Sequence, residues 1–242
     1  MFAVVFALAL ATAYGAEFPS YINVCGRKNP NLNKCILDNI ENLRSKICNG
    51  LTELNLPPLE PLNIERLVIS DSPQNKIYLN DVKISGLCDF QVQAFNADLN
   101  DKYDFDFKLH FNRIYLNGTY DINVQILVPI VHKAPIYLTA DDVKLHALLH
   151  SKMVTKGGKN RLYISELEPH IEMNGYDIKY GLTAEEQTEL SRAVSDLISN
   201  NQEEFAQRFL PSLEEAVAKW MINIFNSFFK TFTYDELFPD RE

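Results

Sequence analysis

The sequence of 242 residues contains none of the short motifs that identify the common enzyme classes. It has no Gly-x-Ser-x-Gly nucleophile turn, no phosphate-binding loop and no dinucleotide-binding glycine pattern. It also lacks a Cys-x-x-Cys pair, the usual spacing in zinc and thiol redox sites. We therefore expect a protein that is not an enzyme and that uses neither a cofactor nor a metal ion.

Positive charge is scarce as well. The chain has 23 Lys and Arg against 32 Asp and Glu, which gives a net charge of −9. A nucleic-acid-binding protein needs basic side chains to displace counterions from phosphates, and anionic lipid surfaces attract basic segments. The charge balance therefore argues against a nucleic-acid partner and against docking on anionic lipid.

Long apolar runs are absent beyond the N-terminus, so nothing there approaches the length of a membrane-spanning helix. Residues 2–11 form an unbroken apolar run that is too short to span a bilayer and is closed by the small pair Ala13 and Gly15, with cleavage expected near Gly15 or Ala16. This pattern is typical of a secretory signal peptide, although a retained apolar strand or helix is the alternative. We predict a signal peptide over 1–16, one domain over 17–242, and a secreted protein without a stable membrane anchor.

Cysteines do not occur after position 88. The four present are Cys25, Cys35, Cys48 and Cys88, and an even number in an exported chain predicts disulfides. Three pairings are possible. The residues between Cys25 and Cys35 form turns readily, which favours that pair and leaves Cys48 to bond with Cys88.

Apolar periodicity predicts helices at both ends and strands between them. Residues 33–48 repeat at helical intervals, and the proline-rich stretch 56–61 then imposes an extended connector. From Leu62 to about Tyr180 the period is two, which predicts a long antiparallel sheet with one dry face. We therefore expect an α+β domain in which helices cover that sheet.

The helical period returns at Thr183, where Glu186 completes a capping box. A longer helix follows from about Phe205 to Phe228, and Pro211 is expected to interrupt or kink it. Within the sheet, Gly157-Gly158 and Asn174-Gly175 are both predicted to reverse the chain, the latter as a two-residue hairpin turn.

Two groups of side chains invite a catalytic or metal-binding interpretation. His146 and His150 would share one face of a helix, but a strand separates them by about 13 Å and prevents shared ligation of a metal. Glu168, His170 and Glu172 alternate along one strand, as acid–base groups could. The same spacing is typical of a solvated sheet face, which is the interpretation that we favour.

Asn117-Gly118-Thr119 is an acceptor sequence for N-glycosylation. Its use requires Asn117 to face solvent. The alternative is an ordinary hairpin turn or bulge.

Four segments in register resemble the takeout proteins of insects, which are relatives of the haemolymph juvenile-hormone-binding proteins. They are residues 29–35 (NPNLNKC), 56–61 (LPPLEP), 118–123 (GTYDIN) and 234–239 (YDELFP). Together they extend over nearly the whole mature chain. The sequence departs from the family pattern at Val124, where glycine is common.

The resemblance implies a TULIP-like α+β fold in which a curved, highly twisted antiparallel sheet wraps around a long C-terminal helix and encloses an apolar tunnel. It implies extracellular transport of a small lipophilic ligand, for example an isoprenoid, a fatty-acid-like molecule or one like juvenile hormone. Roles in feeding, chemosensation or circadian output belong to the same family. Cys25 and Cys35 occupy its N-terminal disulfide positions, and the lack of later cysteines favours the takeout branch.

Positions whose phase suits the lining of such a tunnel are Phe105, Phe107, Leu109, Phe111, Tyr120, Ile122, Val124, Ile126, Phe205, Phe209, Leu213 and Trp220. From the residues alone, a fully packed core is the alternative to a tunnel. A second functional hypothesis is a secreted interaction protein whose C-terminal helix displays aromatic side chains to a partner or membrane. Those side chains would be Phe225, Phe228, Phe229 and Phe232. The sequence names no protein receptor.

Overall fold

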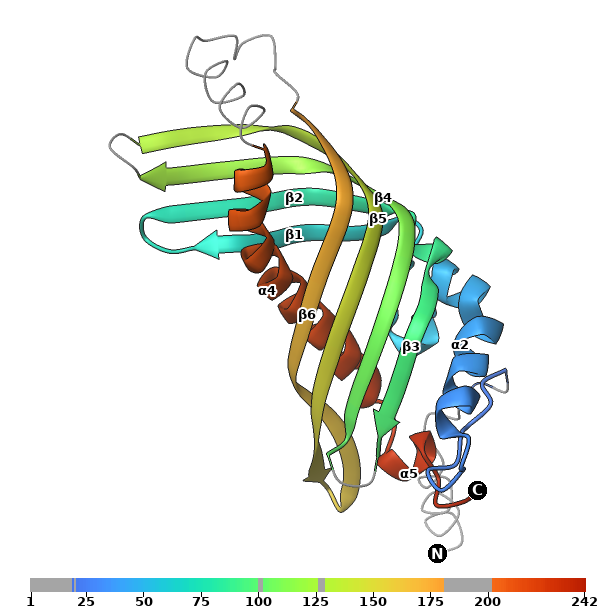
Figure 1. Ribbon diagram of the computed structural model, residues 1–242. Helices are drawn as coiled ribbons and strands as arrows, with labels where there is room; N and C mark the ends of the chain where they lie inside the picture. Colours follow the sequence, from blue (N-terminus) through green and yellow to red (C-terminus); the bar gives the residue numbers. More distant parts are fainter. Residues whose placement is uncertain (1–18, 20, 100–101, 126–128, 181–201) are drawn as a thin grey trace, which may run out of the picture.

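The computed structural model describes residues 19, 21–99, 102–125, 129–180 and 202–242 (Figure 1). Within these ranges the side chains of 130, 180 and 202–209 are not described. The predicted signal peptide over 1–16 and the predicted helix cap at Thr183 lie outside the described residues.

Six antiparallel strands form one sheet in the order β1-β2-β4-β5-β6, with β3 paired to part of β4. The sheet begins at Leu62 and ends at Tyr180, as the two-residue period predicted. The strands are β1 (Leu62–Asp71), β2 (Asn75–Ser85), β3 (Gln91–Asp98), β4 (Asp104–Gln125), β5 (Pro129–Lys156) and β6 (Lys159–Tyr180).

Helices flank this sheet at both ends of the chain. α2 (Leu32–Asn49) and α4 (Gln202–Phe229) correspond to the two amphipathic segments of the sequence, and α5 (Tyr234–Leu237) is a single turn near the C-terminus. Short 3-10 turns, η1 (Thr52–Leu54) and η2 (Leu87–Asp89), join α2 to β1 and β2 to β3. The predicted α+β class is therefore confirmed.

The sheet curls, and α4 lies along its concave side (Figure 1). α4 contacts both β6 and β1, which are the two edges of the main strand order. The helix therefore closes a half-barrel. This arrangement covers the apolar concave face of the sheet with a helix.

A sharp bend crosses the three longest strands and gives the sheet its curl (Figure 1). Phe111 and Ile114 on β4 both contact the core, as do Ala140 and Val143 on β5, so the inward phase shifts by one residue between them. On β6 the same level is occupied by Asn174-Gly175, because Gly175 pairs with Asp141. The prediction of a hairpin at Asn174-Gly175 is therefore wrong. The chain does not reverse here: β6 continues through Asn174-Gly175, and this turn-forming pair lies at the bend of the strand.

Polar side chains connect the strands at this bend on the side away from the core. Asp142 adopts a positive φ of 49°, and its carboxylate accepts a hydrogen bond from His110 Nε2 at 2.7 Å and another from the Asn174 side chain. Hydrogen bonds from His110 and then Asn174 lower the pKa of Asp142. Arg113 pairs with Asp141 beside them. The bend is thus stabilised by local charge pairing.

The reversal predicted at Gly157-Gly158 is confirmed as the two-residue turn between β5 and β6. Both glycines have positive φ, 60° and 73°, the combination that a type I′ turn requires.

Side chains of α4 satisfy backbone groups along the outer edge of β6. Asn226 accepts from the Ile164 N–H at 2.8 Å and donates to the Ile164 carbonyl at 3.0 Å. Glu214 accepts from the Ile171 N–H at 2.7 Å. Because an unpaired strand edge is a site for unwanted pairing, these bonds both anchor α4 and protect the sheet.

Pro211 lies inside α4, which continues through it, so of the two predicted effects the interruption does not occur. Leu213 and Ala216, just beyond it, pack against the sheet. This packing outweighs the loss of one backbone hydrogen bond at the proline.

Both predicted disulfides are present, Cys25–Cys35 with Cα atoms 6.0 Å apart and Cys48–Cys88 with Cα atoms 5.8 Å apart. The second connects the end of α2 to η2. Arg44 strengthens that connection, because Nη1 donates to the carbonyls of Cys88 and Phe90 at 2.9 and 2.8 Å.

Candidate functional site

The candidate site is the concave, apolar face of the sheet under α4. Side chains on this face form three groups. We call the group near α5 the α5 end, the group near the β1–β2 hairpin and the N-terminal half of α4 the hairpin end, and the group at the bend the middle. Their buried members include Leu149, Ile164, Phe229 and Phe232 at the α5 end; Leu62, Leu79, Val82, Tyr120 and Ala216 at the hairpin end; and Phe90, Phe111 and Val143 in the middle.

The α5 end is packed as an ordinary protein core. Phe232 is 1 % exposed and Ile164 is fully buried. The Phe105 ring stacks against Phe229, with centroids 6.5 Å apart. Contact between buried aromatic rings is typical of a packed protein core.

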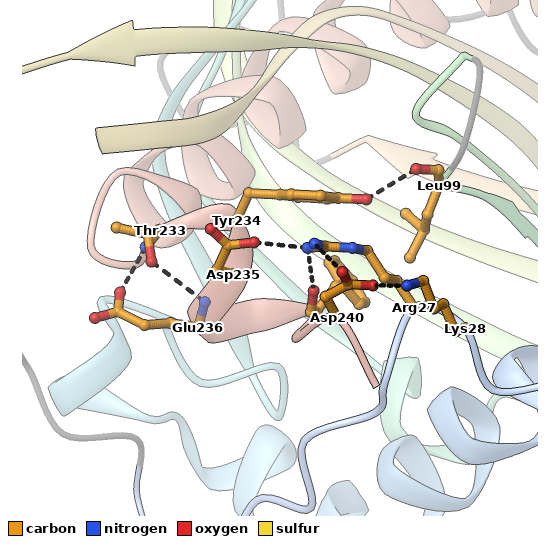
Figure 2. A network of polar contacts seen from close by, with 9 residues as sticks. Arg27, Lys28, Leu99, Thr233, Tyr234, Asp235, Glu236 and Asp240 are labelled. Atoms are coloured by element: carbon orange, nitrogen blue, oxygen red, sulfur yellow. Dashed lines mark hydrogen bonds and ion pairs between the residues drawn. The ribbon is translucent and has the colours of Figure 1, made fainter. Parts of the chain in front are cut away.

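Several polar contacts at the α5 end are shown in Figure 2. The Tyr234 hydroxyl donates to the Leu99 carbonyl at 2.8 Å, and burial raises the pKa of this phenol. Thr233 and Glu236 form a capping box, in which each side chain bonds to the other's backbone N–H. Mainly through the hydrogen bond from the Thr233 N–H, the pKa of Glu236 is lowered.

The N-terminal disulfide loop is held against the C-terminal tail at this same end. Arg27 pairs with Asp235 at 2.6 Å, and Lys28 pairs with Asp240 at 2.7 Å (Figure 2). The Arg27 N–H also donates to the Pro239 carbonyl at 3.0 Å. A Cβ on Gly26 would lie 2.1 Å from the Arg241 carbonyl oxygen, so this close approach requires glycine. The family-like segment 234–239 therefore contacts the start of the disulfide loop, just before the family-like segment 29–35.

At the hairpin end the apolar lining is less completely buried. Tyr120 is buried, whereas Ile122, Leu213 and Trp220 are only partly buried against the same group. Aliphatic side chains of β1 and β2 supply most of the remaining surface. Apolar side chains on this part of the concave face are therefore only in part covered by their described neighbours.

The predicted lining positions lie on the concave face wherever their side chains are described, but in different groups. Phe105 and Phe107 belong to the α5 end, Leu109 and Phe111 to the middle. Tyr120, Ile122, Leu213 and Trp220 are brought together at the hairpin end, and Val124 is partly buried near the end of β4. Ile126, Phe205 and Phe209 lie outside the described side chains. For all twelve positions, contact with a ligand stays a prediction.

Sequence reasoning missed one polar side chain on this face, His132 on β5. Its Nδ1 lies 2.7 Å from the Tyr120 hydroxyl, and the two rings are stacked with centroids 5.4 Å apart. His132 shares the inward phase of Ala134 and Ile136, and that signal could have identified it.

The histidines considered for metal binding lie on the opposite, outward face. His146 and His150 both belong to β5, a strand as predicted, and His146 Nε2 lies 2.9 Å from Asp106 Oδ1. His170 and Glu172 are exposed on β6, consistent with a solvated face. A groove of about 460 Å³ on this face is lined by His146, His170 and Glu172, together with Lys108 and Lys144. Within the described part of the chain, no group of three His, Cys, Asp or Glu side chains is placed to hold a metal ion.

The aromatic side chains of the C-terminal helix are core residues. Phe229 and Phe232 are 8 % and 1 % exposed, and Phe225 and Phe228 pack against the same core group. The hypothesis that they are displayed to a partner or membrane is therefore wrong. None of the helices in the described ranges is long and apolar enough to cross a bilayer.

Asn117 lies within β4, paired with Lys83 on one side and Tyr137 on the other. It is neither a hairpin turn nor a bulged residue, although β2 is irregular opposite it. Its side chain is exposed, as glycosylation requires.

Comparisons with known proteins agree with this architecture. The family model for haemolymph juvenile hormone binding protein matches residues 2–239. Circadian clock-controlled protein daywake of Drosophila melanogaster is 22% identical over 232 residues, covering 91% of this chain and 88% of daywake. The crystal structure of Epiphyas postvittana Takeout 1 superposes with a TM-score of 0.65 at 17% identity, covering 89% of this chain and 99% of that one. At this identity the superposition shows a shared fold, the takeout-like half-barrel. The chain belongs to the haemolymph juvenile hormone binding protein family.

Proposed function

We propose that this protein is a secreted carrier of a small lipophilic ligand, bound between the concave face of the sheet and α4. The observation that carries the proposal is a curled sheet with an apolar concave face, closed by a helix that contacts both edge strands. Such a fold can enclose an elongated apolar molecule without any catalytic group. Family membership supports the same function.

The hairpin end is the part of this face that we propose to hold most of the ligand. Its lining is aliphatic and aromatic, and several side chains there are only partly buried. Each Å² of apolar surface removed from water contributes about 25 cal/mol before the cost of association. The ligand class is therefore isoprenoid-like, fatty-acid-like or like juvenile hormone, recognised by shape and apolarity.

Secretion is part of the proposal. The apolar segment within 1–16 has the pattern of a signal peptide, and two disulfides suit an oxidising compartment. The exposed Asn117 is available for a glycan if the chain passes through the secretory pathway. A link to daily rhythm, feeding or chemosensation is also proposed, the first of these because the relative daywake is clock-controlled.

The first test is mass spectrometry of an organic extract of the protein secreted by insect cells, with the intact mass measured on the same sample. We expect a stoichiometric apolar molecule and a mass that reflects loss of the signal peptide and of four hydrogens. Absence of an extractable lipid, together with failure to take up an apolar fluorescent probe, would contradict the carrier function.

Two matched variants locate the ligand. Ile136→Trp places a bulky ring on the concave face at the hairpin end, whereas Tyr137→Trp changes its neighbour, which is 50% exposed. Uptake of the fluorescent probe N-phenyl-1-naphthylamine should fall at least about tenfold in the first variant and stay unchanged in the second. Equal uptake by both variants would place the ligand elsewhere.

A further inference from the structure

One ring nitrogen on the concave face has no partner. His132 Nε2 is buried, and no hydrogen-bonding group in the described part of the chain reaches it. A buried polar atom without a partner destabilises the folded state, so such atoms are rare and call for an explanation. At the α5 end, in contrast, the buried Tyr234 hydroxyl bonds to the Leu99 carbonyl.

Contacts with Tyr120 fix the position of the His132 ring and determine which ring nitrogen carries the proton. Ring stacking on Tyr120 and the 2.7 Å contact between the Tyr120 hydroxyl and Nδ1 hold the imidazole in place. A phenol is a far better proton donor at this contact than a neutral imidazole is, so Nδ1 accepts and the ring proton resides on Nε2. The unpartnered atom is therefore a donor.

Apart from the Tyr120 hydroxyl, the described side chains next to His132 on this face are apolar. Tyr120, Ile122 and Ala134 belong to the hairpin end, and Ile122 is directly opposite His132 in the β4–β5 pairing. The ring nitrogen is thus one polar point on an otherwise apolar wall. Ligand sites commonly consist of an apolar wall with a few polar groups that fix orientation.

We propose that His132 Nε2 donates a hydrogen bond to an uncharged carbonyl oxygen at one end of the lipophilic ligand, with Tyr120 fixing the tautomer. The ligand class is therefore an ester, ketone or aldehyde on an apolar chain, in preference to a pure hydrocarbon. This inference rests on the proposed carrier function, because it assigns a recognition group to the same concave face.

The experiment compares two probes of similar size, methyl tetradecanoate and pentadecane, as competitors of bound N-phenyl-1-naphthylamine. The wild-type protein should bind the ester about tenfold more tightly than the hydrocarbon, the size of one hydrogen bond to a donor that is otherwise unsatisfied. His132→Phe should abolish that preference by weakening ester binding, with pentadecane binding unchanged or tighter. Tyr120→Phe should reduce the preference in part.

His146→Phe is the matched control, because His146 lies on the same strand but on the outward face, 46% exposed at its side chain. It should leave both affinities unchanged. A second measurement follows the side-chain nitrogen resonances of the histidines in ¹H–¹⁵N spectra. The His132 Nε2 resonance should shift on addition of methyl tetradecanoate and much less on addition of pentadecane.

The outcomes separate the two proposals. If the wild-type protein binds both probes equally and His132→Phe changes neither affinity, the recognition role of His132 is overturned while the carrier function stands. If the wild-type protein takes up neither probe and does not bind the fluorophore, the carrier function itself fails, and the role of His132 fails with it.

Discussion

The two ends of the half-barrel use similar apolar residues in different ways. The α5 end is closed by stacked aromatic rings, a capping box and ion pairs between the two chain termini, and its buried hydroxyl at Tyr234 is bonded. The hairpin end has aliphatic side chains that remain partly buried and a buried ring nitrogen without a partner. The difference fits our proposal that the first end mainly stabilises the fold and that the second binds the ligand. Proteins commonly combine a rigid, well-packed region with a less stable region that binds.

The largest effect on stability is expected from shortening a buried side chain at the packed α5 end. Phe232→Ala should lower the free energy of unfolding by about 3–5 kcal/mol, because the ring is almost fully buried and its neighbours cannot fill the cavity. Ile122→Ala at the hairpin end should cost only about 1–2 kcal/mol, since its side chain is already partly exposed. Urea unfolding of ligand-free protein measures both values. Val131→Ala, at a residue 69% exposed, is the control and should change stability little. Equal losses at Phe232 and Ile122 would remove the distinction between the ends.

The next effect contrasts a bonded buried polar group with an unbonded one. Tyr234→Phe should cost about 1–3 kcal/mol, because it leaves the Leu99 carbonyl without its donor. The double variant Tyr120→Phe/His132→Phe should be neutral or stabilising in ligand-free protein, because it removes the buried His132 Nε2 that has no hydrogen-bond partner together with the hydroxyl bonded to the same ring. Urea unfolding of both variants provides the comparison. A strongly destabilised double variant would mean that the hairpin end depends on this pair for its fold.

A smaller effect is expected at the cap of α5. Thr233→Ala should cost about 1 kcal/mol, whereas Thr233→Ser retains the hydroxyl that accepts from the Glu236 N–H and should cost little. The pKa of Glu236 is lowered in the folded state, so its contribution is present above about pH 4.3 and is lost as the pH falls through the folded-state pKa. Unfolding of wild type and Glu236→Gln measured from pH 7 to pH 3 should therefore show the difference between them shrinking in acid. A difference independent of pH would argue against the capping box.

The smallest effect is expected at the bend that joins the two ends. Asp142→Asn removes the charge that accepts from His110 and Asn174 and should lower Tm by at most about 2 °C. Because the pKa of Asp142 is lowered on folding, its contribution is present above about pH 3.9 and is lost as the pH falls. Thermal unfolding of both proteins at pH 7 and pH 3 checks this. Asp121→Asn, on the same sheet but away from the bend, is the control. A larger loss of Tm in acid than at neutral pH would contradict the assignment.

Much of the fold could be predicted from the residues. Helical spacing located α2 and α4 to within a few residues, and the two-residue period began and ended the sheet at Leu62 and Tyr180. Turn chemistry identified Gly157-Gly158 correctly because both residues need positive φ there. The same chemistry was misleading at Asn174-Gly175, where a pair that is suited to a hairpin instead allows a long strand to bend.

The sequence predicted which side chains lie on the concave face, but it did not predict which of them pack together. Alternation placed Phe105, Phe111 and Tyr120 on the dry face, but it could not show that the first lies in the packed α5 end and the last in the hairpin end. The one-residue shift of phase at the bend separates them, and its polar stabilisation by Asp142 depends on strands distant in sequence.

By itself the sequence determined the class of elements, the acidic character and the family, because each depends on local spacing or composition, and it favoured the disulfide pairing that the structure contains. Only the tertiary structure decided that α4 joins both sheet edges, that the C-terminal phenylalanines are buried, and that His132 Nε2 is buried without a partner. The physical reason is that burial and hydrogen-bond satisfaction depend on which distant residues the curl of the sheet brings together. A sequence pattern specifies the face on which a side chain lies, and the fold determines what it meets there.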